Sequence, residues 1–238
     1  MTAHASSAGR GRFITIEGPE GAGKTSQAAR LEAALRGRGL AVIGTREPGG
    51  TVLGERIREL LLAPSSSPID PLADALLFNA ARRQLVEEVI EPSLAAGTTV
   101  ICARFADSTR AYQGYGGGLP HDELQRLEDI ATGGLRPDLT IVLDVPVEIG
   151  LARKAPDDRT RFETGFDVAF HRRVRSGFLA MAVAEPQRFV VIDATADEDA
   201  VTRRLLRAVE AALDASGDPG SLEAAASEPN RPTARTTR

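Results

Sequence analysis

The sequence contains very little cysteine and histidine. Cys102 is the single cysteine, and 3 histidines are spread over 238 residues. One cysteine cannot build an internal disulfide framework and is typical of a protein in a reducing compartment. With so few thiol and imidazole ligands, a structural zinc site is not expected.

Long apolar runs and an excess of positive charge are missing as well. No stretch approaches the roughly 18 consecutive apolar residues of a membrane span, and residues 1–12 lack the apolar segment of a secretory signal peptide. We therefore expect a cytoplasmic protein without a membrane partner. The 29 Lys and Arg residues against 33 Asp and Glu give a formal net charge of −4. This balance argues against a nucleic-acid partner but allows a local basic pocket for a phosphorylated small molecule.

The remaining composition is that of one ordinary domain. Apolar residues make up 42% of the chain and charged residues 26%, which is normal for a globular protein with a core. Residues 1–12 and 214–238 carry little apolar side-chain surface beyond alanine, too little to offset the entropy lost on ordering. The sequence thus predicts one domain over residues 13–213, between two disordered tails.

Within that domain, short apolar runs alternate with segments of helical periodicity. The runs are nearly continuous in apolar character, as is typical of strands buried on both faces of a parallel sheet. They cover residues 13–16, 41–43, 98–102, 139–143 and 189–192. The alternation predicts a three-layer, doubly wound α/β/α fold with a five-stranded parallel sheet.

The strongest motif follows the first predicted strand and precedes a predicted helix. It reads Gly18-Pro19-Glu20-Gly21-Ala22-Gly23-Lys24-Thr25, which matches the phosphate-binding loop G-x-x-x-x-G-K-[ST]. The glycines let backbone N–H groups turn toward phosphate oxygens, while Lys24 reaches the β- and γ-phosphates and the Thr25 hydroxyl can bind Mg²⁺. The motif predicts a protein that binds a nucleoside triphosphate.

Further arginine-rich segments point to a second phosphate-bearing ligand. The chain has no Asn-Lys-x-Asp segment for reading guanine, and at this length we do not expect the extra domains of a motor ATPase. Arg46 and Arg104 follow the second and third predicted strands, at the sheet edge where ligands bind in this architecture. A basic stretch over residues 153–165 could close over a triphosphate as a short lid.

Taken together, the motifs resemble those of bacterial thymidylate kinases, from about Phe13 to Leu213. The resemblance rests on the phosphate loop with Glu17 before it and on five further segments, which are Thr45-Arg46-Glu47-Pro48-Gly49-Gly50-Thr51, Phe78-x-Ala80-Ala81-Arg82, Ser108-Thr109-x-Ala111-Tyr112-Gln113-Gly114, Arg136-Pro137-Asp138-Leu139 and Ile192-Asp193-Ala194-Thr195. It implies ATP-dependent phosphorylation of dTMP to dTDP with Mg²⁺, in a P-loop fold, by a homodimer.

The resemblance also implies roles at the phosphates and the metal. Glu20 would lie near the deoxyribose hydroxyl of the acceptor and would bind Mg²⁺ with Thr25. Arg46 and Arg104 would hold the acceptor phosphate. Members with an acid inside the phosphate loop take their catalytic arginine from the lid, and Arg153, Arg159 and Arg161 are the candidates here. Lys24, Arg104 and these lid arginines form the expected catalytic set.

Recognition of the two bases is implied in the same way. Phe78 would stack on thymine, and Arg82 would donate a hydrogen bond to its O4 atom. Thr109 and Gln113 would line the edge of the base, and Tyr112 would close against the sugar and disfavour a 2′-hydroxyl. The segment from Asp193 to Thr195 would lie near the adenine of ATP.

One position departs from the family pattern. Family members carry an aspartate directly before the arginine that ends the third strand, whereas this chain reads Cys102-Ala103-Arg104-Phe105. That carboxylate would help to hold Mg²⁺ and to orient the arginine. Asp144 follows a different strand and is not an obvious substitute. Two alternatives therefore stay open beside the dTMP kinase, namely a weak or inactive nucleotide-binding module and a kinase for another pyrimidine deoxynucleoside monophosphate.

Overall fold

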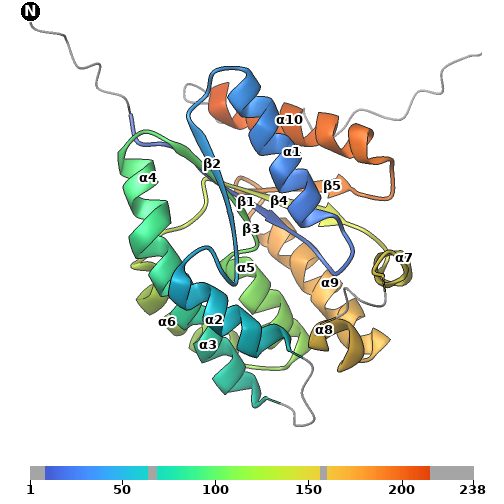
Figure 1. Ribbon diagram of the computed structural model, residues 1–238. Coiled ribbons are helices and arrows are strands. Elements are labelled where there is room, and N and C mark those ends of the chain that lie inside the picture. Colours follow the sequence, from blue (N-terminus) through green and yellow to red (C-terminus); the bar gives the residue numbers. More distant parts are fainter. Residues whose placement is uncertain (1–8, 64–68, 156–159, 215–238) are drawn as a thin grey trace, which may run out of the picture.

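Five parallel strands form the centre of the computed structural model, in the order β2-β3-β1-β4-β5 (Figure 1). The strands are β1 (Phe13–Glu17), β2 (Val42–Arg46), β3 (Thr99–Ala103), β4 (Leu139–Asp144) and β5 (Phe189–Asp193). This confirms the predicted five-stranded parallel sheet, although β2 continues to Arg46, three residues beyond the predicted run. The structure describes residues 9–63, 69–155 and 160–214, so most of the two predicted tails lies outside the described residues.

Helices cover both faces of the sheet, which gives the three predicted layers. On one face lie α1 (Lys24–Gly37) and α10 (Glu198–Asp214) (Figure 1). The other face is covered by α3 (Pro71–Leu85), the π-helical turn η1 (Val86–Ile90), α4 (Glu91–Ala95), a second π-helical segment η2 (Arg110–Gly116) and α9 (Val168–Ala184). The remaining helices are α2 (Val52–Leu62), α5 (Ala106–Thr109), α6 (His121–Thr132), α7 (Val147–Ala152) and α8 (Arg161–Thr164).

The core consists of side chains that pack on the two faces of the sheet. Leu31 and Leu205 are fully buried against one face. On the other face, Phe170 and Phe178 of α9 lie in the core, while Phe166 precedes α9 and stays partly exposed. None of the helices in the described part of the chain is both long enough and apolar enough to span a bilayer.

Local sequence determines where α3 begins. Pro71 occupies the first turn, where its missing N–H is not needed, and the Asp70 side chain accepts hydrogen bonds from the Leu72 and Ala73 amides. This start fixes the helix that carries Phe78 and Arg82 beside the carboxyl ends of β2 and β3.

A buried ion pair fixes the short helix α5 behind those strand ends. Arg188 Nη1 donates to Asp107 Oδ2 at 2.7 Å and to Thr140 Oγ1 at 2.8 Å. Thr140 in turn shares a hydrogen bond with Thr15 on the neighbouring strand at 2.9 Å. The Asp107 side chain is 3% exposed, and burying a carboxylate without a charged partner is costly.

Removal of that partner should be costly. Arg188→Met leaves the Asp107 carboxylate buried without its cation, and the free energy of unfolding should fall by about 3 kcal/mol in urea titrations. The double variant Arg188→Met/Asp107→Asn should lose less than the sum of the two single variants. The exposed pair between Arg172 and Glu148 provides the control, because Arg172→Met should cost under about 1 kcal/mol. Equal losses in Arg188→Met and Arg172→Met would contradict this assignment.

Candidate active site

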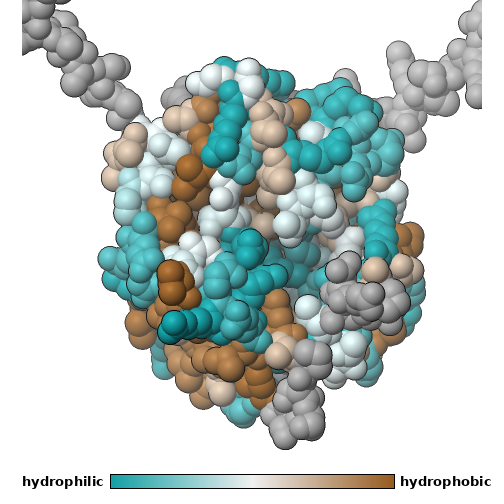
Figure 2. All heavy atoms as spheres, viewed as in Figure 1, coloured by the Kyte–Doolittle hydropathy of each residue, from teal (hydrophilic) through white to brown (hydrophobic). Residues whose placement is uncertain are grey.

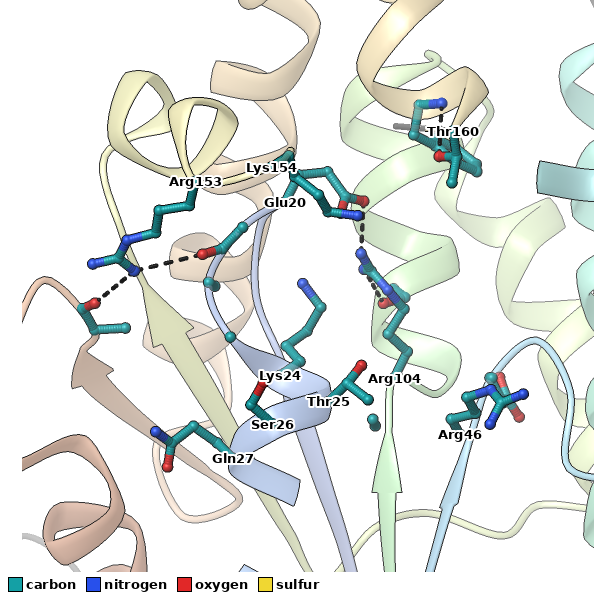
Figure 3. A pocket seen from close by; sticks show the side chains of 18 of the residues that line it. Glu20, Lys24, Thr25, Ser26, Gln27, Arg46, Arg104, Arg153, Lys154 and Thr160 are labelled. Atoms are coloured by element: carbon teal, nitrogen blue, oxygen red, sulfur yellow. Dashed lines mark hydrogen bonds and ion pairs between the residues drawn. The ribbon is translucent and has the colours of Figure 1, made fainter. Parts of the chain in front are cut away.

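A cleft of about 980 Å³ opens at the carboxyl ends of the strands. Figure 2 shows it as a hollow on this face, surrounded by hydrophilic side chains. Most of the predicted site residues line it, namely Glu20, Gly21, Ala22, Gly23, Lys24, Thr25, Arg46, Phe78, Arg104, Thr109, Tyr112, Gln113 and Arg153. In Figure 3, Lys24 and Thr25 lie between Arg153 and Gln27 on one side and Arg104 and Arg46 on the other. The cleft thus has two ends that meet at the phosphate loop.

The phosphate loop needs its glycines for steric reasons. Gly21 has a φ of +68°, and a Cβ atom there would overlap the backbone carbonyl of Gly150. Lys24 Nζ donates to the carbonyl oxygens of Gly18 and Pro19 at 2.9 and 2.6 Å. Burial and the nearby Arg104 charge lower the pKa of Lys24 to about 7, opposed by Glu20. Additional negative charge at this position, such as a phosphate, would therefore favour the protonated lysine.

Glu20 connects the two ends of the cleft. Its Oε1 atom accepts from Arg104 Nη2 at 2.6 Å and from the Tyr112 hydroxyl at 2.8 Å. Although burial opposes ionisation, the Arg104 and Lys24 charges hold the pKa of Glu20 far below its usual value. Glu20 is therefore an ionised carboxylate surrounded by cations.

The acceptor end contains one more cationic side chain than the sequence predicted. Arg58 lines the cleft, and its Nη1 atom donates to the Pro48 carbonyl at 2.9 Å. Burial and the neighbouring Arg46 charge lower the pKa of Arg58. The spacing on α2 could have indicated this residue. Gly54 packs closely on Gly49, in the loop between β2 and α2. Arg58 lies four residues after Gly54 and therefore on the same face of the helix. Arg46, by contrast, is half exposed and pairs with Glu55 at 3.0 Å.

Arg82 lies directly behind the cleft wall and is not one of its lining residues. It is 1% exposed, and its guanidinium donates to Glu47 Oε2, Asn79 Oδ1 and Thr109 Oγ1, each at 2.9 Å. A guanidinium has five N–H donors. Here Nε faces Glu47, Nη2 faces both Thr109 and Glu47, and one hydrogen of Nη1 faces Asn79. Among the described residues, the second Nη1 hydrogen therefore has no acceptor. Burial raises the pKa of Glu47 to about 7, opposed by Arg82. The arginine is thus held rigidly with one donor to spare.

The lid arginines differ in their surroundings. Arg153 lines the cleft and donates to the Ala194 carbonyl at 3.0 Å. Arg161 instead is buried against α3, where it pairs with Asp74 and donates to the Leu61 carbonyl. It points away because the adjacent Phe162 faces the cleft, 5.4 Å edge-on from the Tyr112 ring. The predicted catalytic role of Arg161 therefore finds no support in its position, and Arg159 lies outside the described residues.

Two further predicted residues shape the cleft without lining it. Asp193 accepts hydrogen bonds from the Thr195 amide and hydroxyl at 2.9 and 2.6 Å, and this turn presents Ala194 to the cleft. Nearby, Gln27 donates to the Glu198 carbonyl at 3.0 Å. Sequence reasoning missed this contribution of Gln27 and of the start of α10, because it depends on long-range packing of α1 on α10.

The predicted Mg²⁺ ligands of the cleft are two side chains, Glu20 and Thr25. Nowhere in the described part of the chain do three His, Cys, Asp or Glu side chains come together as a metal site. Glu20 and Thr25 both line the cleft, and Ala103 beside them offers no ligand. Asp144 pairs with Arg175 at 2.7 Å, so it does not replace the missing acid.

Comparisons with known proteins agree with this geometry. The family model described as Thymidylate kinase matches residues 16–205. A thymidylate kinase from Deinococcus radiodurans is 53% identical over 200 residues, covering 84% of this chain and 97% of that protein. A thymidylate kinase from Thermomicrobium roseum is 54% identical over 191 residues, covering 79% of this chain and 90% of that protein. The crystal structure of thymidylate kinase from Ehrlichia chaffeensis superposes on this structure with a TM-score of 0.69 at 35% sequence identity. The superposition covers 84% of this chain and 99% of that chain. The chain therefore belongs to the thymidylate kinase family.

Proposed function

We propose that this chain transfers the γ-phosphoryl group of ATP to dTMP, giving dTDP and ADP. The observation that carries the proposal is one cleft in which a phosphate loop meets a second, arginine-rich end with an aromatic ring. The loop supplies Lys24, and the second end supplies Arg46, Arg58 and Arg104. Such an arrangement suits two phosphate groups that must be brought together despite their like charges.

Recognition of thymine rests on stacking and on a fixed polar edge. Phe78 lines the cleft and offers a ring face for the base. The spare Nη1 hydrogen of Arg82 would donate to O4, and Thr109 and Gln113 complete the edge. Gln113 Nε2 donates to Asp74 at 2.9 Å, which fixes the orientation of its amide. Rigid donors of this kind discriminate among bases because a wrong base leaves a buried donor unpaired.

The transfer itself needs positioning and positive charge rather than a covalent intermediate. Lys24 would hold the β- and γ-phosphates, and Arg104 would hold the acceptor phosphate in line with them. From the other end, Arg153 would add positive charge as the phosphoryl group moves. Tyr112, fixed by its hydrogen bond to Glu20, would lie against the deoxyribose and disfavour a ribose 2′-hydroxyl.

Mg²⁺ fits the donors of this cleft. Magnesium in phosphoryl-transfer sites is held by one or two carboxylates, phosphate oxygens and water. Glu20 is ionised, and its Oε2 atom is free of hydrogen bonds from the described residues, while Thr25 provides a hydroxyl. The ion would neutralise charge on the phosphate oxygens when bound.

A homodimer is part of the proposal. Large apolar side chains are exposed on the neighbouring helices α2 and α3, with Leu60 at 65% and Leu76 at 49%. Hydrophobic side chains gather over these helices at the lower left of Figure 2. An apolar surface shared by two packed helices is well suited to cover its equivalent in a second copy.

Loss of the phosphate-loop lysine should abolish most turnover. Lys24→Ala should lower kcat for dTMP about 100- to 1000-fold, since a fixed donor to the transferred group is removed. The melting temperature should stay near that of the wild type, because burial already disfavours the lysine charge. Arg172→Ala, at an exposed position, is the control. A kcat within tenfold of wild type in a coupled ADP assay would contradict the assignment.

The missing carboxylate can be restored in place. Ala103→Asp should lower the Mg²⁺ concentration for half-maximal rate by up to about tenfold, with a smaller change in kcat. Wild-type protein should already turn over dTMP, because Glu20 and Thr25 remain. Turnover in Ala103→Asp alone would instead mean that the natural chain is a nucleotide-binding module.

The dimer can be tested by charge substitution on its proposed surface. Leu60→Glu and Leu76→Glu should shift the protein from dimer to monomer in sedimentation velocity, because dimer formation would then have to bury a carboxylate at the contact. Val183→Glu changes an equally apolar residue, 81% exposed on α9, and should leave the dimer intact. A wild-type protein that sediments as a monomer would contradict this part of the proposal.

A further inference from the structure

Glu17 is a fully buried acid that the proposed chemistry does not use. It is the last residue of β1, directly before the phosphate loop, and it is 0% exposed. Its side chain reaches across to the end of β3, where Oε1 accepts from the Phe105 amide at 2.7 Å. Oε2 accepts from the Ser108 hydroxyl at 2.6 Å. Both carboxylate oxygens thus hold residues that flank Arg104.

The first of these bonds stabilises an unusual backbone. Arg104 has a φ of +71°, the one positive value among the described residues other than glycine. A left-handed conformation is unfavourable for a residue with a Cβ atom, so neighbouring contacts must hold it. The Arg104 amide donates to the Ile16 carbonyl at 3.0 Å, and the next amide, that of Phe105, donates to Glu17. The end of β1 therefore fixes the peptide groups on both sides of the Arg104 Cα atom.

The second bond reaches the guanidinium. Because the Ser108 hydroxyl donates its proton to Glu17, its oxygen is left to accept from Arg104 Nη1, at 3.2 Å. The other end of the guanidinium, Nη2, bonds to Glu20 (Figure 3). The Ala103 side chain carries no polar group, so among the described residues Glu17 and Glu20 are the acids that hold this arginine, one through Ser108 and one directly.

We propose that Glu17 is a positioning residue that aims Arg104 at the acceptor phosphate, through the Phe105 amide and the Ser108 hydroxyl. The proposal rests on the function proposed above, since it assigns a partner to the phosphate-holding arginine. It explains why a carboxylate is buried where it touches neither cleft nor solvent. Without it, the Arg104 backbone would lose one of its two anchors and the guanidinium would lose its oriented acceptor.

The test compares a ligand that carries the phosphate with one that lacks it. Glu17→Gln should raise the dissociation constant for dTMP about tenfold, while that for thymidine changes less than about twofold. The Michaelis constant for ATP should likewise change little. Ser108→Ala, which removes only the bridging hydroxyl, should give a smaller change in the same direction. Glu128→Gln, a buried acid paired with Arg110, is the control and should leave the preference for dTMP over thymidine unchanged.

A double-mutant cycle with Arg104 separates positioning from general stability. In an Arg104→Met background, Glu17→Gln should have almost no further effect on dTMP binding, because the residue it positions is gone. Equal effects in both backgrounds, or equal weakening of dTMP and thymidine, would overturn the proposal. If Glu17→Gln does not fold, the same cycle with Ser108→Ala decides the question. Failure of the proposed function would differ, since wild-type protein would then not phosphorylate dTMP at all.

Discussion

The cleft depends on a balance between clustered positive charge and one ionised carboxylate. Lys24, Arg58 and Arg104 lie close enough that burial and mutual repulsion lower the pKa values of the first two. Glu20 offsets that repulsion and stays ionised because of it. The cations are therefore held in fixed positions before any phosphate arrives. Preorganised charge of this kind requires little rearrangement during phosphoryl transfer.

The parallel sheet places these groups at one edge. β1 leads into the phosphate loop, β2 ends at Arg46, and β3 ends just before Arg104. The register pairs Arg46 with Ala103 and Ile16 with Ala103, so the three strand ends lie side by side. The contacts of Glu17 then connect β1 to the turn after β3. The strand that carries the phosphate loop therefore contacts the turn that holds Arg104, and this links the two ends of the cleft structurally.

Much of this was predictable from the sequence, and the exceptions have physical reasons. Continuous apolar runs revealed the buried strands, and the phosphate loop, Phe78 and Tyr112 were identified from local motifs. Arg58 and Gln27 were missed because their contributions depend on how helices pack over long sequence separations. Arg161 was expected in the cleft, but the sequence could not show that Phe162 takes the inward position. Arg82 was expected at the cleft surface and instead lies just behind it, held by Glu47, Asn79 and Thr109.

If this cleft is a dTMP kinase site with rigid base recognition, its preference among nucleoside monophosphates follows directly. The most direct measurement is ADP release by the wild-type protein with Mg²⁺ and ATP across dTMP, dUMP, UMP, dCMP, dAMP and dGMP. We expect the highest kcat/KM for dTMP, a lower value for dUMP and a much lower one for UMP, whose 2′-hydroxyl would meet Tyr112. A higher kcat/KM for another monophosphate, or no ADP release with any of them from folded protein, would contradict it.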